Sequence, residues 1–140
     1  MSVVRHGSVH ISAKSDYAIK AMVELSRVPP GTMLTAHDIA DRQQIPLRFL
    51  LNILADLRRV DLVDSRRGPT GGWWIVRPAA EISAADVVRA VDGPLAGHAA
   101  TVGGDPDLVD ELWVSVQSSI RDVLEQTTVA DLATSSAAQG

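Results

Sequence analysis

The chain has 140 residues, of which 46% are hydrophobic and 21% charged, so it can build a globular core and is not a disordered protein. It contains no cysteine, which excludes disulfides, thiolate nucleophiles and zinc or iron–sulfur sites held by cysteine alone. The sequence offers no long apolar run and no secretory signal, so we expect a cytoplasmic protein without a membrane partner.

The net charge of −4 is distributed unevenly along the chain. Residues 46–78 carry six arginines and three acids, whereas residues 79–140 carry two arginines and ten acids. An acidic total argues against a protein that coats nucleic acid indiscriminately, but the basic middle segment can still face phosphates. On charge alone, an ordinary solvated surface explains the same pattern equally well.

The first predicted element is a helix that follows an irregular N-terminal segment. Residues 1–10 show no hydrophobic period and are expected to form a flexible arm. Ser12 or Ser15 can cap a helix that runs to about Val28. Two prolines and a glycine at 29–31 end this helix, because proline cannot donate to a helical hydrogen-bond ladder.

Two short helices are predicted next. Thr35 caps a helix over residues 36–42, with Asp38 at the third helical position as in a capping box. After a break of about three residues, Pro46 suits the start of a helix over residues 47–60. This helix carries one apolar stripe, formed by Leu47, Leu50, Leu54 and Leu57. Its other side carries long polar side chains, among them Arg48, Asn52, Arg58 and Arg59.

This pair of helices is typical of a helix-turn-helix, although many small helical proteins share the pattern. Residues 62–67 and 73–77 then predict two strands around a glycine-rich loop at 68–72. Such a small loop lets the backbone approach a duplex while a nearby arginine enters the minor groove. An ordinary solvated hairpin is the alternative, but its place after a helix-turn-helix favours a DNA-contacting wing.

The tryptophans at the hairpin alternate on their strand. Of Trp73 and Trp74, one should therefore pack inward and the other face outward. Packing in the core is the simpler interpretation for both, and an aromatic platform for a ligand is a weaker alternative.

The C-terminal part is predicted to contain a long helix. A linking helix and a loop occupy residues 81–105, a helix spans 106–133, and a disordered tail covers 134–140. Apolar residues recur every three or four positions in the long helix, at Val109, Leu112, Val116, Ile120 and Val123. This seam predicts a dimerisation helix, because the rest of the chain is small; a core helix within one subunit is the alternative.

Several segments resemble the Rrf2 family (IscR/NsrR type) of bacterial winged helix-turn-helix regulators. They include ISAKSDYAIKAM at 11–22, DIADRQQIP at 38–46 and LRRVDLVDSRRGPTGG at 57–72. The similarity is close over residues 11–95 and looser as far as Leu132. It implies a mainly α fold with a small β-hairpin: a winged helix-turn-helix domain over 11–80 and a long C-terminal dimerisation helix. It also implies a homodimeric transcriptional regulator, expected to be a repressor on a palindromic operator in double-stranded DNA.

The expected DNA contacts fall on the second helix of the motif and on the hairpin. Arg48 can pair with guanine and Asn52 with adenine in the major groove. Arg67 matches the family's wing arginine and is the minor-groove candidate, whereas Leu51 stands where well-studied cluster-binding members place an acid. The full set of candidate DNA-binding residues is Lys14, Thr35, Arg48, Phe49, Asn52, Arg58, Arg59, Arg66, Arg67, Gly68 and Thr70.

Many members of the family hold an iron–sulfur cluster through three cysteines in a loop that corresponds to residues 96–105. Here that loop contains His98 and no cysteine. A metal site needs three or four ligands, and recruitment of His6 and His10 from the arm is not favoured. We therefore expect no cofactor and no metal site. Control by abundance, by a regulatory protein or by a small-molecule ligand remains open.

A winged-helix protein-interaction module, with weak or partner-dependent DNA binding, is the alternative to a regulator. An enzyme is excluded, because the chain shows no catalytic triad, phosphate-binding glycine motif or paired metal ligands.

Overall fold

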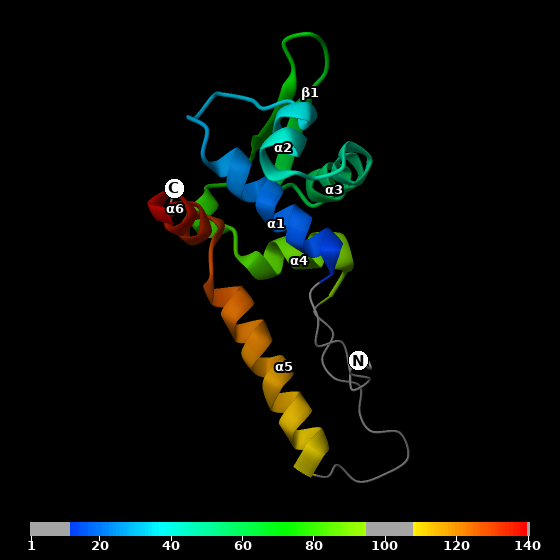
Figure 1. The fold of residues 1–140 in the computed structure, drawn as a ribbon, viewed down its shortest axis with the longest axis vertical. Coiled ribbons are helices and arrows are strands. Elements are labelled where there is room, and N and C mark those ends of the chain that lie inside the picture. The colour runs from blue at the N-terminus through cyan, green and yellow to red at the C-terminus, as the bar shows by residue number, and fades with distance from the viewer. Residues whose placement is uncertain (1–11, 95–107, 140) are drawn as a thin grey trace.

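The computed structural model describes residues 12–94 and 108–139, which form a head and a projecting stem (Figure 1). The head contains the helix-turn-helix, the hairpin, a fourth helix and the C-terminal helix, and the stem is a single long helix. The elements are α1 (Ala13–Ser26), α2 (Ala36–Gln43), α3 (Leu47–Arg59), β1 (Val63–Arg66), β2 (Gly72–Ile75), the 3₁₀ helix η1 (Ala79–Glu81), α4 (Ala84–Asp92), α5 (Leu108–Gln126) and α6 (Val129–Gln139). The predicted fold class, mainly helical with a small hairpin, is confirmed.

Helix α1 is the central element of the head, because it packs against α2, α3, α4, α6 and β2. Ser12 is its N-cap, and the Ser12 hydroxyl accepts a hydrogen bond from the Ser15 backbone N–H at 2.9 Å. Ser15 is therefore not the cap; it is fully buried, and its hydroxyl donates to the Asp92 carboxylate at the end of α4. The start of α1 and the end of α4 are thus joined by a partly buried polar contact.

The helix-turn-helix forms as the sequence predicts. The Thr35 hydroxyl accepts from the Asp38 backbone N–H at 3.0 Å, and the Asp38 carboxylate accepts from the Thr35 N–H at 3.3 Å, which completes the capping box of α2. The C-cap of α2 is Gln44, which adopts the left-handed conformation at a φ of 55°. The buried residues of α3 are Leu50, Ile53, Leu54 and Leu57. Leu47, expected on that stripe, packs only partly against the core.

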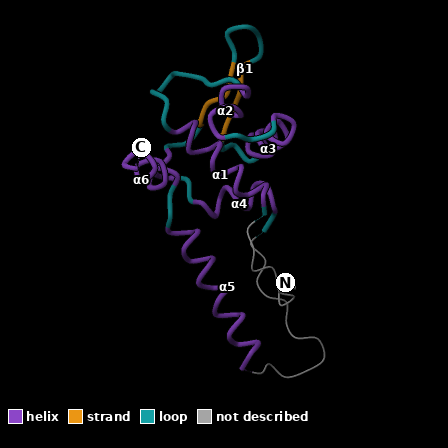
Figure 2. The backbone as a smooth tube through the Cα atoms, viewed as in Figure 1, coloured by secondary structure: helices purple, strands orange, loops and turns teal. Residues whose placement is uncertain are grey.

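The hairpin pairs β1 with β2 in antiparallel register, from Val63 opposite Ile75 to Arg66 opposite Gly72 (Figure 2). The connection between α1 and α2 runs beside β2, where Leu34 and Trp73 exchange two backbone hydrogen bonds of 2.7 and 3.0 Å. Gly72 permits this approach, because a Cβ there would lie 2.9 Å from the Leu34 carbonyl oxygen. The hairpin is therefore fixed to the helix-turn-helix through its backbone.

The C-terminal region differs from the prediction. Instead of one helix over 106–133 and a disordered tail over 134–140, α5 ends at Gln126 and α6 runs from Val129 to Gln139. Thr128 caps α6, with reciprocal 3.0 Å hydrogen bonds between Thr128 and Asp131. Val129 is fully buried and its N–H donates to the Ile82 carbonyl at 2.8 Å, so the chain returns to the head.

Two expected features, the N-terminal arm at 1–10 and the loop at 96–105, lie outside the described residues. Within residues 12–94 and 108–139, no helix is long and apolar enough to cross a membrane.

The tip of the hairpin closes only with glycine at position 71. A Cβ at Gly71 would lie 1.9 Å from the Arg66 carbonyl oxygen, a distance that requires the backbone to move. We expect Gly71→Ala to lower the free energy of unfolding by roughly 1–3 kcal/mol through strain in the wing. Cross-strand NOEs and amide exchange of β1 and β2 measure this effect. Pro69→Ala, at an exposed neighbouring position, is the control. Cross-strand NOEs of equal intensity in Gly71→Ala and Pro69→Ala would contradict the prediction.

Candidate nucleic-acid interface

The outer face of α3 follows from the burial of its inner face. With Leu50, Ile53, Leu54 and Leu57 packed in the core, residues on the opposite side of the helix must face solvent. Arg48 and Asn52 are both exposed there. Two apolar side chains accompany them, since Phe49 is 57% exposed and Leu51 is 47% exposed. This face can therefore offer both hydrogen-bonding groups and apolar contacts.

Arg48, Arg66 and Arg67 are the candidate cations whose side chains make no ion pair or hydrogen bond within the described part of the chain. All three are exposed: Arg48 lies near the start of α3, Arg66 at the end of β1 and Arg67 directly after it. A guanidinium without an internal partner loses no existing contact when it binds a phosphate or a base edge.

Lys14 and Arg59, two further candidates, share an acidic partner. The Lys14 ammonium lies 2.8 Å from the Asp56 carboxylate, and the Arg59 guanidinium pairs with the other oxygen of that carboxylate. Burial raises the pKa of Asp56, but the hydrogen bonds and charges of Lys14 and Arg59 outweigh it and hold this pKa below its ordinary value. The cluster joins α1 to α3 and partly neutralises both cations.

Arg58 joins α3 to the hairpin. Its Nη1 donates to the Ser65 hydroxyl at 2.9 Å, and its guanidinium carbon lies 5.6 Å from the centre of the Trp73 ring. Trp73 is thus the tryptophan that packs inward, as one of the pair was expected to do, whereas Trp74 lies on the other face of the hairpin. Arg58 is therefore exposed but also holds α3 to the hairpin.

The wing presents an open tip. Gly68 has a φ of +104°, a conformation that L side chains rarely adopt, and Arg67 and Thr70 on either side of it are exposed. With Arg67 before the turn and little side-chain bulk within it, the tip can approach a groove closely.

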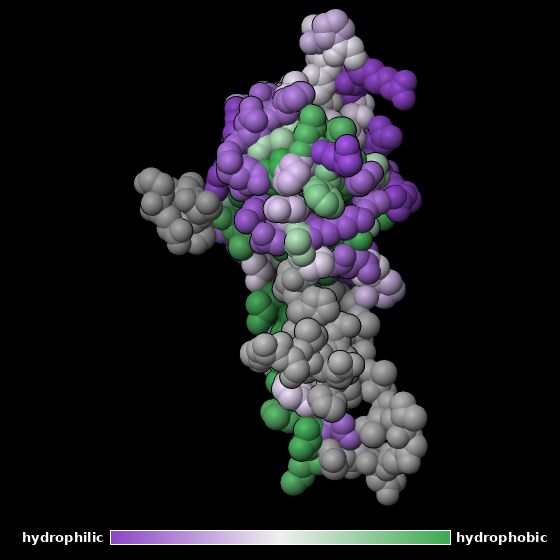
Figure 3. Space-filling view, turned by 45° about the vertical axis from the view of Figure 1, so that its right-hand side comes forward, coloured by the Kyte–Doolittle hydropathy of each residue, from purple (hydrophilic) through white to green (hydrophobic). Residues whose placement is uncertain are grey.

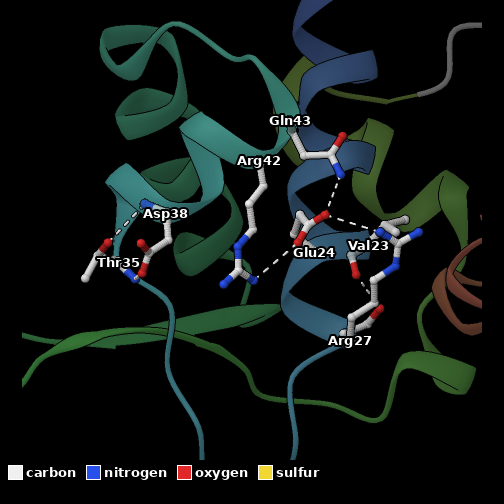
Figure 4. A network of polar contacts seen from close by, with 8 residues as sticks. Val23, Glu24, Arg27, Thr35, Asp38, Arg42 and Gln43 are labelled. Carbon is white, nitrogen blue, oxygen red and sulfur yellow. Dashed lines mark hydrogen bonds and ion pairs between the residues drawn. The ribbon is translucent and has the colours of Figure 1, made fainter. Parts of the chain in front are cut away.

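The N-terminus of α2 carries Thr35, whose hydroxyl is engaged in the capping box (Figure 4). The hydroxyl accepts one hydrogen bond there and can still donate its own proton to a phosphate. The Asp38 carboxylate at the same helix end reduces the attraction for an anion that the helix dipole provides. Thr35 is therefore a weaker phosphate candidate than the three unpaired arginines.

A buried carboxylate that was not anticipated from the sequence holds α2 on α1 (Figure 4). Glu24 is 6% exposed, and its Oε1 accepts from Gln43 at 2.7 Å and from Arg27 at 3.2 Å. The guanidinium of Arg42 lies 3.6 Å from its Oε2. This network fixes the first helix of the motif, and it engages Arg42.

The stem carries the predicted apolar seam. Val109, Leu112 and Val123 are exposed, and Val116 and Ile120 are half-buried. Figure 3 shows hydrophobic side chains along one edge of the stem, whereas in the head hydrophilic side chains surround a group of hydrophobic ones. An exposed apolar strip of this kind is typical of a surface that another polypeptide covers.

At its base the stem is held to α4 by Arg89. The guanidinium bridges Glu125 of α5 at 2.9 Å and Asp86 of α4 at 3.0 Å. The hydrogen bond to Glu125 is the main reason why the pKa of Arg89 is raised. The direction of the stem relative to the head therefore depends on this bridge together with the packing of α5 on α4.

Comparison with known proteins identifies close relatives. The model of the Rrf2 family, described as an iron-dependent transcriptional regulator, matches residues 11–135. The chain is 43% identical over 131 residues to Rv1287 of Mycobacterium tuberculosis, named as an HTH-type transcriptional regulator, covering 89% of this chain and 81% of that protein. It is 32% identical over 129 residues to IscR of Serratia proteamaculans, covering 89% and 79%.

Solved structures agree with these relatives. CymR of Bacillus subtilis, described as a global cysteine regulator, superposes with a TM-score of 0.82 at 28% identity, covering 91% of this chain and 98% of that one. IscR of T. potens superposes with a TM-score of 0.77 at 27% identity, covering 92% and 89%. These relatives are regulators rather than enzymes, as the sequence predicts.

The iron dependence in the family's description does not fit the donor set of this chain. A thiolate-held cluster needs cysteines, and the sequence has none. Within the described residues no group of three His, Asp or Glu side chains could hold a metal ion. His98, His6 and His10 lie outside the described residues.

The pairing of Asp56 predicts a specific response to acid. The pKa of Asp56 is lower in the folded chain than in the unfolded chain, where it is about 4. The ionised carboxylate therefore stabilises the fold fully above about pH 4, and this contribution is lost as the pH falls through the folded-state pKa. We expect Asp56→Asn to cost about 1 kcal/mol at pH 7 and progressively less below pH 4. Urea unfolding at a series of pH values measures the difference. Asp41→Asn, on the exposed side of α2, is the control, and parallel curves for wild type and Asp56→Asn would refute the linkage.

Proposed function

This chain belongs to the Rrf2 family of transcriptional regulators, and we propose that it acts as a homodimer that occupies a palindromic operator and represses transcription. The observation that carries the proposal is the set of three arginines, Arg48, Arg66 and Arg67, which are exposed on α3 and the hairpin and have no partner among the described residues. Cations left unpaired next to a helix-turn-helix are suited to the phosphates and base edges of DNA.

In this proposal α3 reads the major groove. Arg48 hydrogen-bonds to guanine and Asn52 to adenine, because each side chain matches the edge of that base. The exposure of Phe49 and Leu51 supports an apolar contribution, and the methyl group of thymine is the apolar feature in that groove. Leu51 cannot make the contacts of an acidic residue, so the operator will differ from those of relatives that carry an acid there.

The wing adds a second contact. Arg67 enters the adjacent minor groove, where the negative potential attracts a guanidinium, and Gly68 and Thr70 keep the tip narrow enough to approach the backbone. Lys14, Thr35, Arg58, Arg59 and Arg66 remain candidates for phosphate contacts. Among them Lys14 and Arg59 must share their charge with Asp56.

The apolar seam of α5 supports the homodimer. A second copy of the same helix would cover Val109, Leu112 and Val123 with matching apolar side chains. Two-fold symmetry of the protein would then require two-fold symmetry of the operator. A dimer bound across a promoter represses by excluding polymerase.

The wing contact is tested by Arg67→Ala. We expect operator binding to weaken by about 1–3 kcal/mol, because one guanidinium leaves the minor groove, while the fold and assembly persist. Fluorescence anisotropy with DNA from upstream of the protein's own gene, at a fixed salt concentration, measures the change. Lys20→Ala is the control, since Lys20 pairs with Asp16 on α1. Operator affinity equal to that of the wild type would remove Arg67 from the interface.

The seam is tested by Leu112→Glu. Leu112 is 54% exposed on the seam, and a carboxylate there should weaken the dimer by roughly thirtyfold or more. The matched control is Val114→Glu, which changes a residue 49% exposed but about 200° further round the helix. Sedimentation equilibrium distinguishes the two variants. A monomeric wild type, or an equal loss of dimer in both variants, would contradict the proposed assembly.

A further inference from the structure

A cavity lies between the connection from α1 to α2 and one face of the hairpin. Its volume is about 210 Å³. The wall is largely apolar and includes Leu25, Val28, Pro30, Met33, Trp74 and Ile75. This volume is below the roughly 300–1,000 Å³ of sites for drug-sized molecules, so the cavity suits a compact metabolite with one ring or a short acyl chain.

The register of the hairpin explains how the cavity arises. Arg66 pairs with Gly72 and Asp64 with Trp74, so Arg66, Gly72 and Trp74 share one face of the two strands. Gly72 has no Cβ, so the connection from α1 to α2 can pack closely against this face; a Cβ there would lie 2.9 Å from Met33 Cβ. The cavity lies next to this contact and is bounded by the indole of Trp74 and by the connection from α1 to α2.

Among the described residues, Arg66 is the only charged one that lines this cavity. Its guanidinium makes no ion pair or hydrogen bond with the described residues, although Asp64 lies on the same face of the hairpin. The Asp64 carboxylate instead accepts from the Ser65 backbone N–H at 2.8 Å. A single unpaired cation beside an apolar, aromatic wall is complementary to a small molecule with an apolar body and one carboxylate.

We propose that this cavity is an effector site for small apolar carboxylic acids, whose carboxylate pairs with Arg66 and whose apolar part lies against Trp74. The same guanidinium is a candidate phosphate contact, so the bound acid and DNA compete for it. Ligand binding therefore lowers DNA affinity.

The site is tested first without DNA. Probes are 3-phenylpropionate, indole-3-acetate and hexanoate, each compared with its neutral primary amide in ¹H–¹⁵N NMR titrations of the full chain. We expect saturable shifts at residues 28–33 and at Trp74 for at least one acid. Arg66→Gln should weaken binding of that acid tenfold or more, because it removes a charge-assisted hydrogen bond. The amide should bind wild type as weakly as the acid binds Arg66→Gln.

The neighbouring Arg67→Gln is the matched control, since Arg67 does not line the cavity and should leave acid binding unchanged. The proposal is overturned if none of the acids shows saturable shifts at residues 28–33 up to about 10 mM. Equal weakening by Arg66→Gln and Arg67→Gln would overturn it as well, because general charge attraction would then explain the binding.

The coupling to DNA is tested separately and depends on the proposed function. A saturating acid should reduce the affinity of the wild type for its promoter DNA to that of Arg66→Gln, and should not change the affinity of Arg66→Gln itself. Acid binding with unchanged DNA affinity would refute the coupling. Absence of any preferred DNA site would refute the proposed function and leave the result for the cavity intact.

Discussion

The burial of one side of α3 is the constraint on which the rest of the molecule depends. Leu50, Ile53, Leu54 and Leu57 are all fully buried against the core of the head. Successive residues of a helix are about 100° apart, so a rotation by one position would expose part of this stripe and bury Arg48 or Asn52. Each large apolar side chain loses about 1.5–3 kcal/mol when it is exposed, and an unpaired buried guanidinium costs more. The outward setting of the basic face is therefore a consequence of core packing.

Backbone hydrogen bonds also fix the wing to the helix-turn-helix. The hydrogen bonds between Leu34 and Trp73 join β2 to the connection between α1 and α2, and Arg58 bridges α3 to Ser65 and Trp73. The helix that would read the major groove and the hairpin that would enter the minor groove are thus parts of one packed unit. This arrangement also places a cavity under the wing, so a ligand there could act on DNA affinity without any change in the core.

Local signals in the sequence predicted most of the fold, and long-range contacts account for what they missed. The Thr35 capping box, the leucine stripe of α3 and the glycine-rich hairpin depend on residues a few positions apart, and all three are present. The end of α5 was missed although it has a local signal, since Thr128 and Asp131 have capping-box spacing. Glu24 and Asp56 join different helices, and spacing alone does not show which cations they bind. For the same reason the sequence did not show that Lys14 and Arg59 share an acid. DNA contact by the candidate residues stays a prediction.

The central claim is that paired heads with outward-facing arginines recognise a two-fold symmetric duplex sequence. Selection of binding sites from a random double-stranded DNA library by the purified full-length chain tests it most directly, because no operator has to be assumed. The account predicts enrichment of an inverted repeat whose half-sites contain guanine and adenine positions suited to Arg48 and Asn52. A library that remains random after selection, or enrichment of a single unrepeated element, would contradict it.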